Sequence, residues 1–420
     1  MLNPDRISRT LFYLLIIFLP TQLGKHFWPN FSFVFGLRLD YLSPTFYFTD
    51  ILILIILLLS SKKIIYFFKK QTGKNVFLFL TFYVFLFLGI LSSKNLPAGL
   101  YGLLKLTEMI FLSIYVIQNF QNLNKKNLFI AFSIPIIYES LLSLFQLFNN
   151  GSMGGLLYFL GERTFNSSTP GIANASINGQ LILRPYATFS HPNVLAGFLV
   201  IFTLFLLNLF TKKEKVVLII LTALATLSLF STLSRIAIVY WLICLIILFA
   251  ISMYKKYKKG KTNIKNVAFI LISIFVIVLI FVKDSTLMQR FSETTVYEQS
   301  FAQRQELTTS SFNMLIKNPL LGVGINNFYF NLTNTLFIQP VHNIFLLILS
   351  QGGIIVFFII MYVLIKALVI VVRLKNIYLF LALLSITVLG SFDHYFLTLQ
   401  QGQILTVLVF GAIYSKKNKL

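Results

Sequence analysis

The chain has little charge, a single cysteine and few carboxylates. Charged residues make up 11% of its 420 positions, whereas a soluble domain of this length carries about a quarter. Cys244 lies in an apolar run, which excludes a disulfide framework and a cysteine-based metal site. Asp-x-Asp, His-x-x-x-His and Glu-x-x-His patterns are missing from the segments that we predict below to face outward. We therefore expect no metal site, no cofactor and no paired-carboxylate glycosidase.

Hydrophobic residues take the place of the missing charge. They make up 57% of the sequence, with 46 phenylalanines, and the mean hydropathy is +0.84. A helix needs about 20 apolar residues to cross a bilayer, and helices rather than an alternating barrel pattern fit these runs. The sequence thus predicts an all-α polytopic membrane protein. About twelve spans are expected, with cores near 10–28, 46–61, 76–93, 98–118, 128–148, 193–210, 216–231, 236–253, 266–282, 342–365, 377–390 and 402–415.

The net charge of +23 is concentrated in short lysine clusters between these runs. With twelve spans and a cytoplasmic N-terminus, every cluster falls on the cytoplasmic side, as the positive-inside rule requires. The clusters lie at 62–63, 69–74, 125–126, 212–215, 255–261 and 416–419. The pattern predicts an inner-membrane protein with both termini in the cytoplasm. No basic stretch is interleaved with polar surface, so nucleic acid is not an expected partner.

The two long loops, 149–192 and 283–341, then face outward, and their cations are mostly arginine. Arginine pairs with phosphate through two parallel hydrogen bonds, so these side chains predict a phosphate-bearing ligand. The alternative is that they anchor loops or pair with outer glutamates. The arginines are Arg163, Arg184, Arg290 and Arg304, joined by Arg235 in the turn Ser231-Thr232-Leu233-Ser234-Arg235.

Three histidines, His191, His342 and His394, lie at predicted outer helix ends. Each could be a helix cap or a headgroup contact. His342 has the better case as a general base, because it adjoins the larger loop and opens the tenth predicted span, where the helix dipole favours an uncharged side chain.

Four segments in order resemble the motifs of the O-antigen ligase/O-antigen polymerase superfamily. Arg184-Pro-Tyr-Ala-Thr-Phe-Ser-His-Pro-Asn-Val-Leu-Ala is similar to its R-x-x-G-T-F-x-H-P-N-x-L-A stretch, with Ala187 in place of the usual glycine. Thr232-Leu-Ser-Arg235 resembles its T-x-S-R turn. Arg304 with Asn318-Pro-Leu-Leu-Gly-Val-Gly resembles a segment in the large loop of this superfamily. His342-Asn343 with Gly352-Gly353 resembles the segment that closes that loop.

The resemblance implies a membrane glycosyltransferase of the C type with a large extracytoplasmic loop. Such enzymes move a glycan from undecaprenyl diphosphate to an acceptor hydroxyl on a glycan or glycolipid, without a metal. By this resemblance His342 is the catalytic base, and Arg235 and Arg304 bind the diphosphate. Arg184, His191, Asn193 and Asn343 are expected to support the donor site. The chain then divides into N-terminal transmembrane helices at 1–148 and a ligase-like region at 149–420.

Two other functions stay open at this stage. A repeat-unit polymerase of the same superfamily differs from a ligase only in its acceptor. A transporter of lipid-linked glycans would place charges within the membrane, where Lys105, Glu108 and Glu139 lie. Most polar residues instead gather at the predicted outer face, which favours an enzyme.

Overall fold

The structure, a computed structural model, describes residues 3–177, 180–209, 214–258, 295–333 and 337–416. These residues are mostly helical, and α-helices run along most of the predicted apolar runs. The helices are α1 (Pro4–Ile17), α2 (Phe48–Leu59), α3 (Ser61–Lys69), α4 (Gly73–Leu91), α5 (Leu96–Asn119), α6 (Lys125–Asn149), α7 (Pro192–Leu209), α8 (Lys215–Ser231), α9 (Arg235–Lys258), α12 (Thr295–Lys317), α13 (Ile344–Arg373), α14 (Ile377–Gly390), α15 (Tyr395–Thr398) and α16 (Gln400–Lys416).

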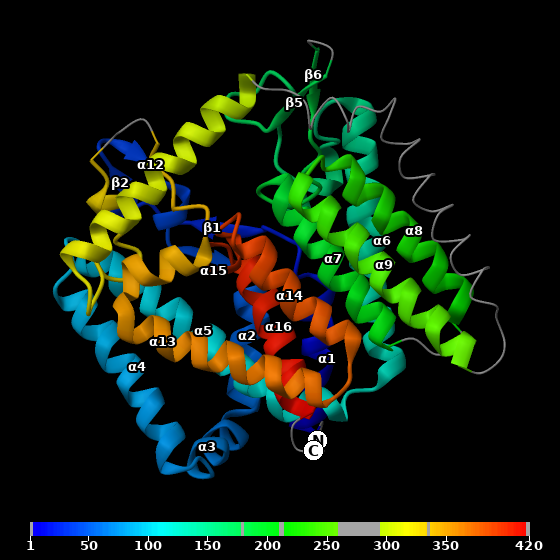
Figure 1. Cartoon of the computed structure of the whole chain (residues 1–420), viewed down its shortest axis with the longest axis horizontal. Coiled ribbons are helices and arrows are strands. Elements are labelled where there is room, and N and C mark those ends of the chain that lie inside the picture. Colours follow the sequence, from blue (N-terminus) through cyan, green and yellow to red (C-terminus); the bar gives the residue numbers. More distant parts are fainter. Residues whose placement is uncertain (1–2, 178–179, 210–213, 259–294, 334–336, 417–420) are drawn as a thin grey trace.

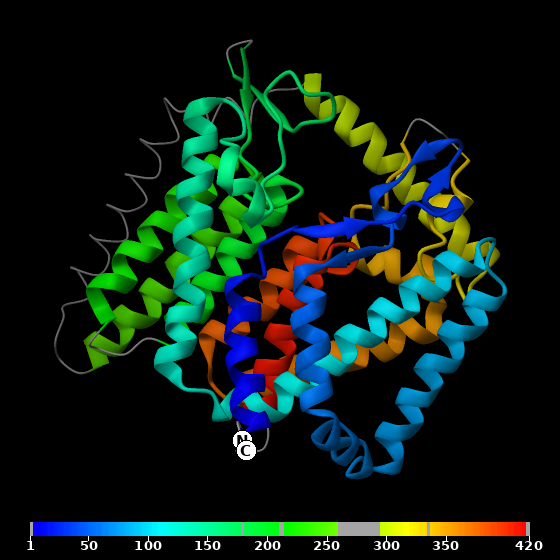
Figure 2. The same cartoon turned by 180° about the vertical axis from the view of Figure 1, so that it is seen from behind.

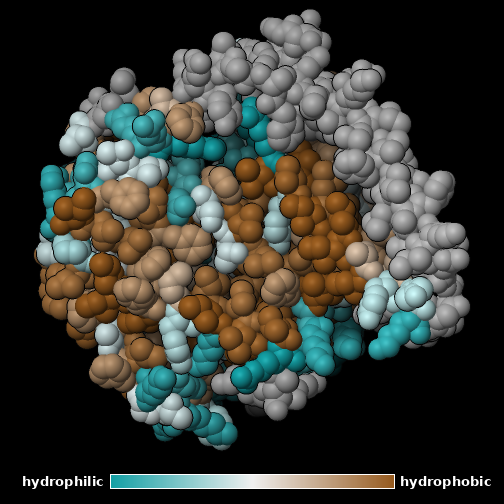
Figure 3. Space-filling view, in the orientation of Figure 1, coloured by the Kyte–Doolittle hydropathy of each residue, from teal (hydrophilic) through white to brown (hydrophobic). Residues whose placement is uncertain are grey.

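The chain is an α-helical membrane protein. Within the described ranges, six helices are long and apolar enough to cross a bilayer, namely α4, α5, α6, α7, α9 and α13. The pair α2–α3, bent by 64°, makes a seventh if it is one span, and α8 and α14 are shorter apolar helices. The predicted span at 266–282 lies outside the described residues, so the expected number of twelve remains a prediction. A broad band of apolar side chains crosses the face shown in Figure 3, with hydrophilic residues above and below it.

The two ends of the helix bundle differ. Figures 1 and 2 place α3 and both chain termini at one end, and the strands β5 and β6 and the helix α12 towards the other. Within the described ranges, six short strands form three antiparallel pairs, a small amount of sheet beside the helices of the all-α fold that the sequence predicted. The pairs are β1 (Gly24–His26) with β4 (Thr45–Tyr47), β2 (Phe33–Val34) with β3 (Leu37–Arg38), and β5 (Asn174–Ile177) with β6 (Gln180–Leu183).

The first predicted span, 10–28, was wrong at its C-terminal end. Helix α1 stops at Ile17, and Pro20 follows within one turn. Proline lacks the N–H that a continuing helix would donate. The chain instead becomes extended, and residues 24–26 pair with residues 45–47. This pairing brings the segment between α1 and α2 over the end of the bundle, beside the cavity described below.

Helix α7 lies at the centre of the packing. Within its span window 83% of the residues are buried, a larger share than for the other candidate spans among the described residues. It packs against α6, α8, α9 and α14, and its side chains contribute to one large apolar core. The segment that leads into α7 is the one with the longest motif, so the core fixes the position of that motif.

Helix α13 is broken at Gly353, and the preceding loop closes the break. Gly353 has φ +70°, outside the helical region. The carbonyl groups of Ser350 and Gln351 therefore accept hydrogen bonds from Val323 N (2.8 Å) and Gly324 N (3.0 Å) of the loop. The Gly322-Val323-Gly324 sequence thus forms a turn, and its glycines allow the close backbone contact. The two motif segments, this loop and Gly352-Gly353, therefore pack directly against each other.

We expect Gly353→Ala to destabilise the protein strongly. A Cβ atom there would lie 2.2 Å from the Leu320 carbonyl oxygen, and alanine is strained at φ +70°. The free energy of unfolding should fall by about 1–3 kcal/mol or more. The fall is measured as a lower melting temperature of the detergent-solubilised protein, followed by size-exclusion chromatography after heating. Gly73→Ala is the control, because a Cβ at Gly73 meets no atom within 4 Å. Equal stability of the two variants would contradict the docking role.

Candidate active site

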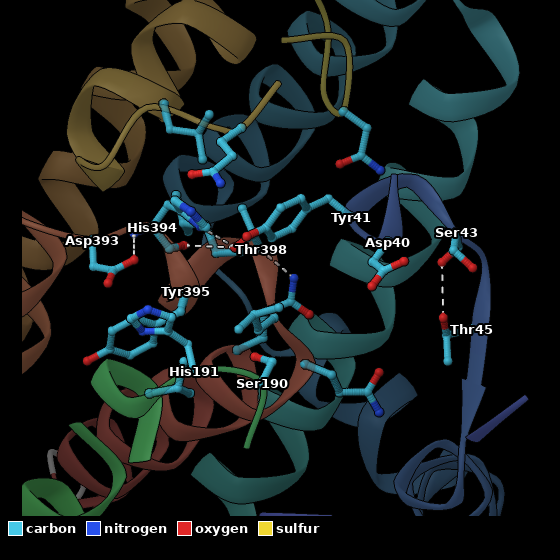
Figure 4. A pocket seen from close by; sticks show the side chains of 18 of the residues that line it. Asp40, Tyr41, Ser43, Thr45, Ser190, His191, Asp393, His394, Tyr395 and Thr398 are labelled. Carbon is cyan, nitrogen blue, oxygen red and sulfur yellow. Dashed lines mark hydrogen bonds between the residues drawn. The ribbon is translucent and has the colours of Figure 1, made fainter. Parts of the chain in front are cut away.

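A cavity of about 850 Å³ opens among the loops at the α15 end of the bundle. Its polar lining comes from segments far apart in the sequence, and Figure 4 shows Asp393 and His394 on one side and Asp40, Ser43 and Thr45 on the other. The cavity brings together most of the predicted site residues, namely Arg184, His191, Asn193, Arg304 and His342. Arg235 and Asn343 are not among its lining residues.

The 184–193 segment is anchored from below by two buried polar side chains of α6. The Gln146 amide oxygen accepts hydrogen bonds from Tyr186 N (3.0 Å) and Ala187 N (2.7 Å). The Glu139 carboxyl group accepts a bond from Thr188 N (3.1 Å) and lies 2.5 Å from the Thr188 hydroxyl oxygen. Ala187 has φ +49°, a left-handed conformation that favours glycine. This conformation explains why glycine is usual at this position of the motif.

A chain of hydrogen bonds runs from α9's leading turn to the cavity wall. Arg184 donates from Nε to the Thr232 carbonyl oxygen (2.8 Å) and from Nη2 to the Asn193 amide oxygen (2.8 Å). Asn193 donates from Nδ2 to Oδ2 of Asp393 (2.9 Å). Arg184 and Asn193 therefore hold Asp393 in place, and the Thr232-to-Arg235 turn supports Arg184.

His342 is not the cap of α13. The side chain of Asn343 caps the helix, accepting bonds from Phe345 N and Leu346 N. Its amide nitrogen donates to the Ser391 carbonyl oxygen (3.1 Å), which ties the start of α13 to the loop before α15. The cap alternative for His342 is thus excluded, and its imidazole is left to line the cavity.

Asp393 lies beside His342. The distance from His342 Nδ1 to Asp393 Oδ1 is 3.9 Å, longer than a hydrogen bond but within one small side-chain movement of it. Among the described residues Nδ1 has no other hydrogen-bond partner, although it is buried. The His394 ring packs against His342, with 5.1 Å between ring centroids. With Nδ1 directed at a carboxylate, Nε2 is the nitrogen available to take a proton.

The sequence reasoning missed Asp393. It considered ligand and acid–base patterns along the chain, whereas His342 and Asp393 come from two segments about 50 residues apart. Ligand atoms of His342, Asp393 and His394 all lie within 4.8 Å of one another, which is close enough to hold a metal ion. The signal available in the sequence was the adjacent pair Asp393-His394 at a predicted outer helix end.

The arginines divide into two groups. Arg163, Arg184 and Arg304 line the cavity, while Arg290 lies outside the described residues. Arg163 donates to the Ser190 carbonyl oxygen (2.8 Å), and Arg304 is exposed on α12. Arg235 instead lines a separate groove with apolar residues of α9 and the α14 end. Of the glutamates predicted as alternative partners, Glu162 accepts backbone N–H groups and the Gln146 amide and so stabilises the 151–162 loop.

The charged residues within the predicted membrane spans pair with nearby residues. Lys105 bridges Asp50 (2.8 Å) and Glu108 (2.7 Å), and Glu139 bonds Thr188 as described above. These contacts give each of the three charges predicted for a transporter path a structural partner.

Burial and neighbouring charges shift the protonation of the cavity residues. Burial alone raises the pKa of the Asp393 carboxyl, but His342 and His394 outweigh it and hold the pKa well below its usual range. Burial lowers the pKa of His394 to about 4, although Asp393 opposes the shift. Burial and then the Arg184 charge lower the pKa of His191 to about 3. At neutral pH these two histidines are uncharged beside a charged carboxylate.

Residues 217–361 match the family model described as O-antigen ligase. The matched stretch begins in α8, ends in α13 and contains Arg235, Arg304 and His342. It confirms the resemblance to the O-antigen ligase and polymerase superfamily, a family of glycosyltransferase-like membrane enzymes of polysaccharide biosynthesis. No curated protein matches the chain.

We expect stability to fall as the pH falls through the window from about 6.5 to 4. His394 has a folded-state pKa of about 4 against 6.5 for the free side chain, so the unfolded chain binds its proton first. The stability due to neutral His394 is complete above 6.5 and is lost below it. Asp393 stays charged in the folded protein throughout this window and adds slope only towards its acid end, where the carboxyl of the unfolded chain begins to bind a proton.

The melting temperature of the detergent-solubilised protein, measured from pH 7.5 to 4.5, checks this expectation. His394→Gln should be less stable at pH 7.5 but should lose less stability on acidification than the parent. Parallel curves for the two proteins would show that His394 is not buried in its neutral form.

Proposed function

We propose that this protein transfers a glycan from an undecaprenyl-diphosphate donor to an acceptor hydroxyl at the outer face of the cytoplasmic membrane, as an O-antigen ligase does. The observation that carries the proposal is the position of His342, which lines a large cavity beside Asp393, with Arg163 and Arg304 in the same lining. A repeat-unit polymerase of the same superfamily is the second candidate, since it needs the same donor chemistry with a different acceptor. Both termini lie in the cytoplasm in this proposal.

His342 acts as the general base. An acceptor hydroxyl is a weak nucleophile, and removing its proton during attack on the sugar contributes about 10²–10⁴ in rate. Nε2 of His342 takes the proton, and Asp393 at Nδ1 orients the ring and stabilises the positive charge that forms on it. Asp393 is a positioning residue, held by Asn193 and Arg184.

The diphosphate leaves with growing negative charge as the glycosidic bond breaks. Fixed guanidinium groups stabilise such charge without rearranging, and Arg304 and Arg163 line the cavity where the leaving group would lie. No metal ion is needed in this scheme. Arg235, outside the cavity, remains a candidate ligand for a part of the donor that extends beyond it.

The test of the base is His342→Asn. Since Asn343 supplies the cap, this variant should fold normally, bind the lipid-linked donor and lose about 10²–10⁴ in transfer rate. Asp393→Asn should lower kcat by about 10²-fold with little change in donor affinity, because the ring of His342 is misplaced rather than removed. Rates are measured with purified protein, donor and acceptor. A His342→Asn enzyme with near-normal turnover would contradict the role of base.

Arg304 is tested by its lysine variant. A point charge cannot copy the two-pronged contact of a guanidinium with phosphate, so Arg304→Lys should lose about 10²–10³ in rate, nearly as much as Arg304→Ala. Lys317→Arg, on the same helix but outside the cavity lining, is the matched control and should behave as the parent. Full activity of Arg304→Lys would show that the positive charge at this position is sufficient and that the two-pronged contact with phosphate is not required.

A further inference from the structure

His342, Asp393 and His394, here called the His-Asp-His cluster, form the one group of potential metal ligands found within the described part of the chain. Their ligand atoms lie within 4.8 Å of one another, and the closest measured pair is His342 Nδ1 and Asp393 Oδ1 at 3.9 Å. Neighbouring ligands of a tetrahedral zinc ion are about 3.4 Å apart, given metal–ligand bonds of about 2.0–2.1 Å. The cluster therefore needs only a small contraction to close on an ion.

One donor atom of the cluster lacks a partner. Nδ1 of His342 is buried and makes no hydrogen bond to a described residue. A buried polar atom without a partner costs free energy, which a bound ion would recover. The cavity of about 850 Å³ in front of the cluster gives an ion access and leaves room for a water ligand.

The surroundings of the cluster match those of a metal site. Nδ1 of His394 bonds the Thr398 hydroxyl (2.7 Å), which leaves Nε2 as its free ligand atom. Oδ2 of Asp393 accepts a bond from Asn193 (2.9 Å), which fixes the carboxylate. Metal-bound histidines and carboxylates are generally oriented by such hydrogen bonds from their other atom. Two imidazoles with one carboxylate suit zinc, whereas magnesium and calcium prefer oxygen ligands.

We propose that the His-Asp-His cluster binds a divalent transition-metal ion, with zinc as the best fit, and that the bound ion switches the enzyme off. Zinc on Nδ1 of His342 places the remaining proton on Nε2, so the ring can no longer accept a proton from the acceptor hydroxyl. It also takes the Asp393 carboxylate away from its positioning role. The inhibition rests on the proposed function, whereas the binding does not.

The binding is measured without substrate. Protein purified with a tag that contains no histidine is stripped with EDTA, titrated with ZnCl₂ by calorimetry, and loaded with Co²⁺ to record the visible absorption of a tetrahedral site. We expect one ion per chain. His394→Gln and His342→Asn should each weaken binding by at least about 10–100-fold. His26→Gln is the control, because His26 lines the same cavity but lies outside the cluster and should bind as the parent does.

A second measurement separates the site from the inhibition. Transfer activity should persist in EDTA, fall when zinc is added in proportion to site occupancy, and ignore magnesium. Absence of stoichiometric binding, or binding that His394→Gln and His342→Asn leave unchanged, would overturn the site. Activity lost in EDTA and restored by zinc would overturn the inhibition and the metal-independent mechanism together. Zinc binding in a protein without transfer activity would keep the site and count against the proposed function alone.

Discussion

The partly buried carboxylate of Asp393 is the contact on which the arrangement of the site depends. It accepts hydrogen bonds from Asn193 and from its neighbour's backbone, His394 N, and it faces His342. These residues belong to three separate segments, which the carboxylate joins at one point. A charge that has lost most of its contact with water is stable only when its partners are well placed, so the three segments constrain one another. The low pKa of Asp393 reflects the same neighbours.

Much of the motif sequence serves to build this contact rather than to touch a substrate. Arg184 and Asn193 hold Asp393 in place. Asn343 caps α13 and ties it to Ser391, and the backbone at Gly353 leaves room for the loop that packs against the break in α13. Several of these motif residues also form the cavity wall, where Arg184, His191 and Asn193 line the cavity together with His342 and Arg304. The proposed metal-independent reaction would need a rigid frame of this kind, because charge would have to be stabilised by groups that are already in position.

The sequence predicted the helices well because long apolar runs have few other structures in lipid. It failed where a short polar contact decides the path, as after Pro20, where β1 pairs with β4 instead of extending α1. It proposed His342 as a candidate base but missed Asp393, since nothing in the sequence indicates that the α14–α15 loop meets the start of α13. The family resemblance grouped Arg235 with Arg304 as diphosphate ligands, whereas the fold places them in different hollows. Ala187 shows the reverse case, in which the structure explains a departure from the motif through its positive φ.

The central claim is that His342 acts as a base rather than as a support for the loop. Chemical rescue of His342→Ala by free imidazoles tests it most directly, because the vacated side-chain volume opens on a cavity that can admit a small base. If His342 is the base, imidazole restores part of the transfer rate, and substituted imidazoles of higher proton affinity restore more of it. His342 is not the base if the variant binds the donor normally and no imidazole restores transfer, or if the rescue does not depend on the proton affinity of the added imidazole.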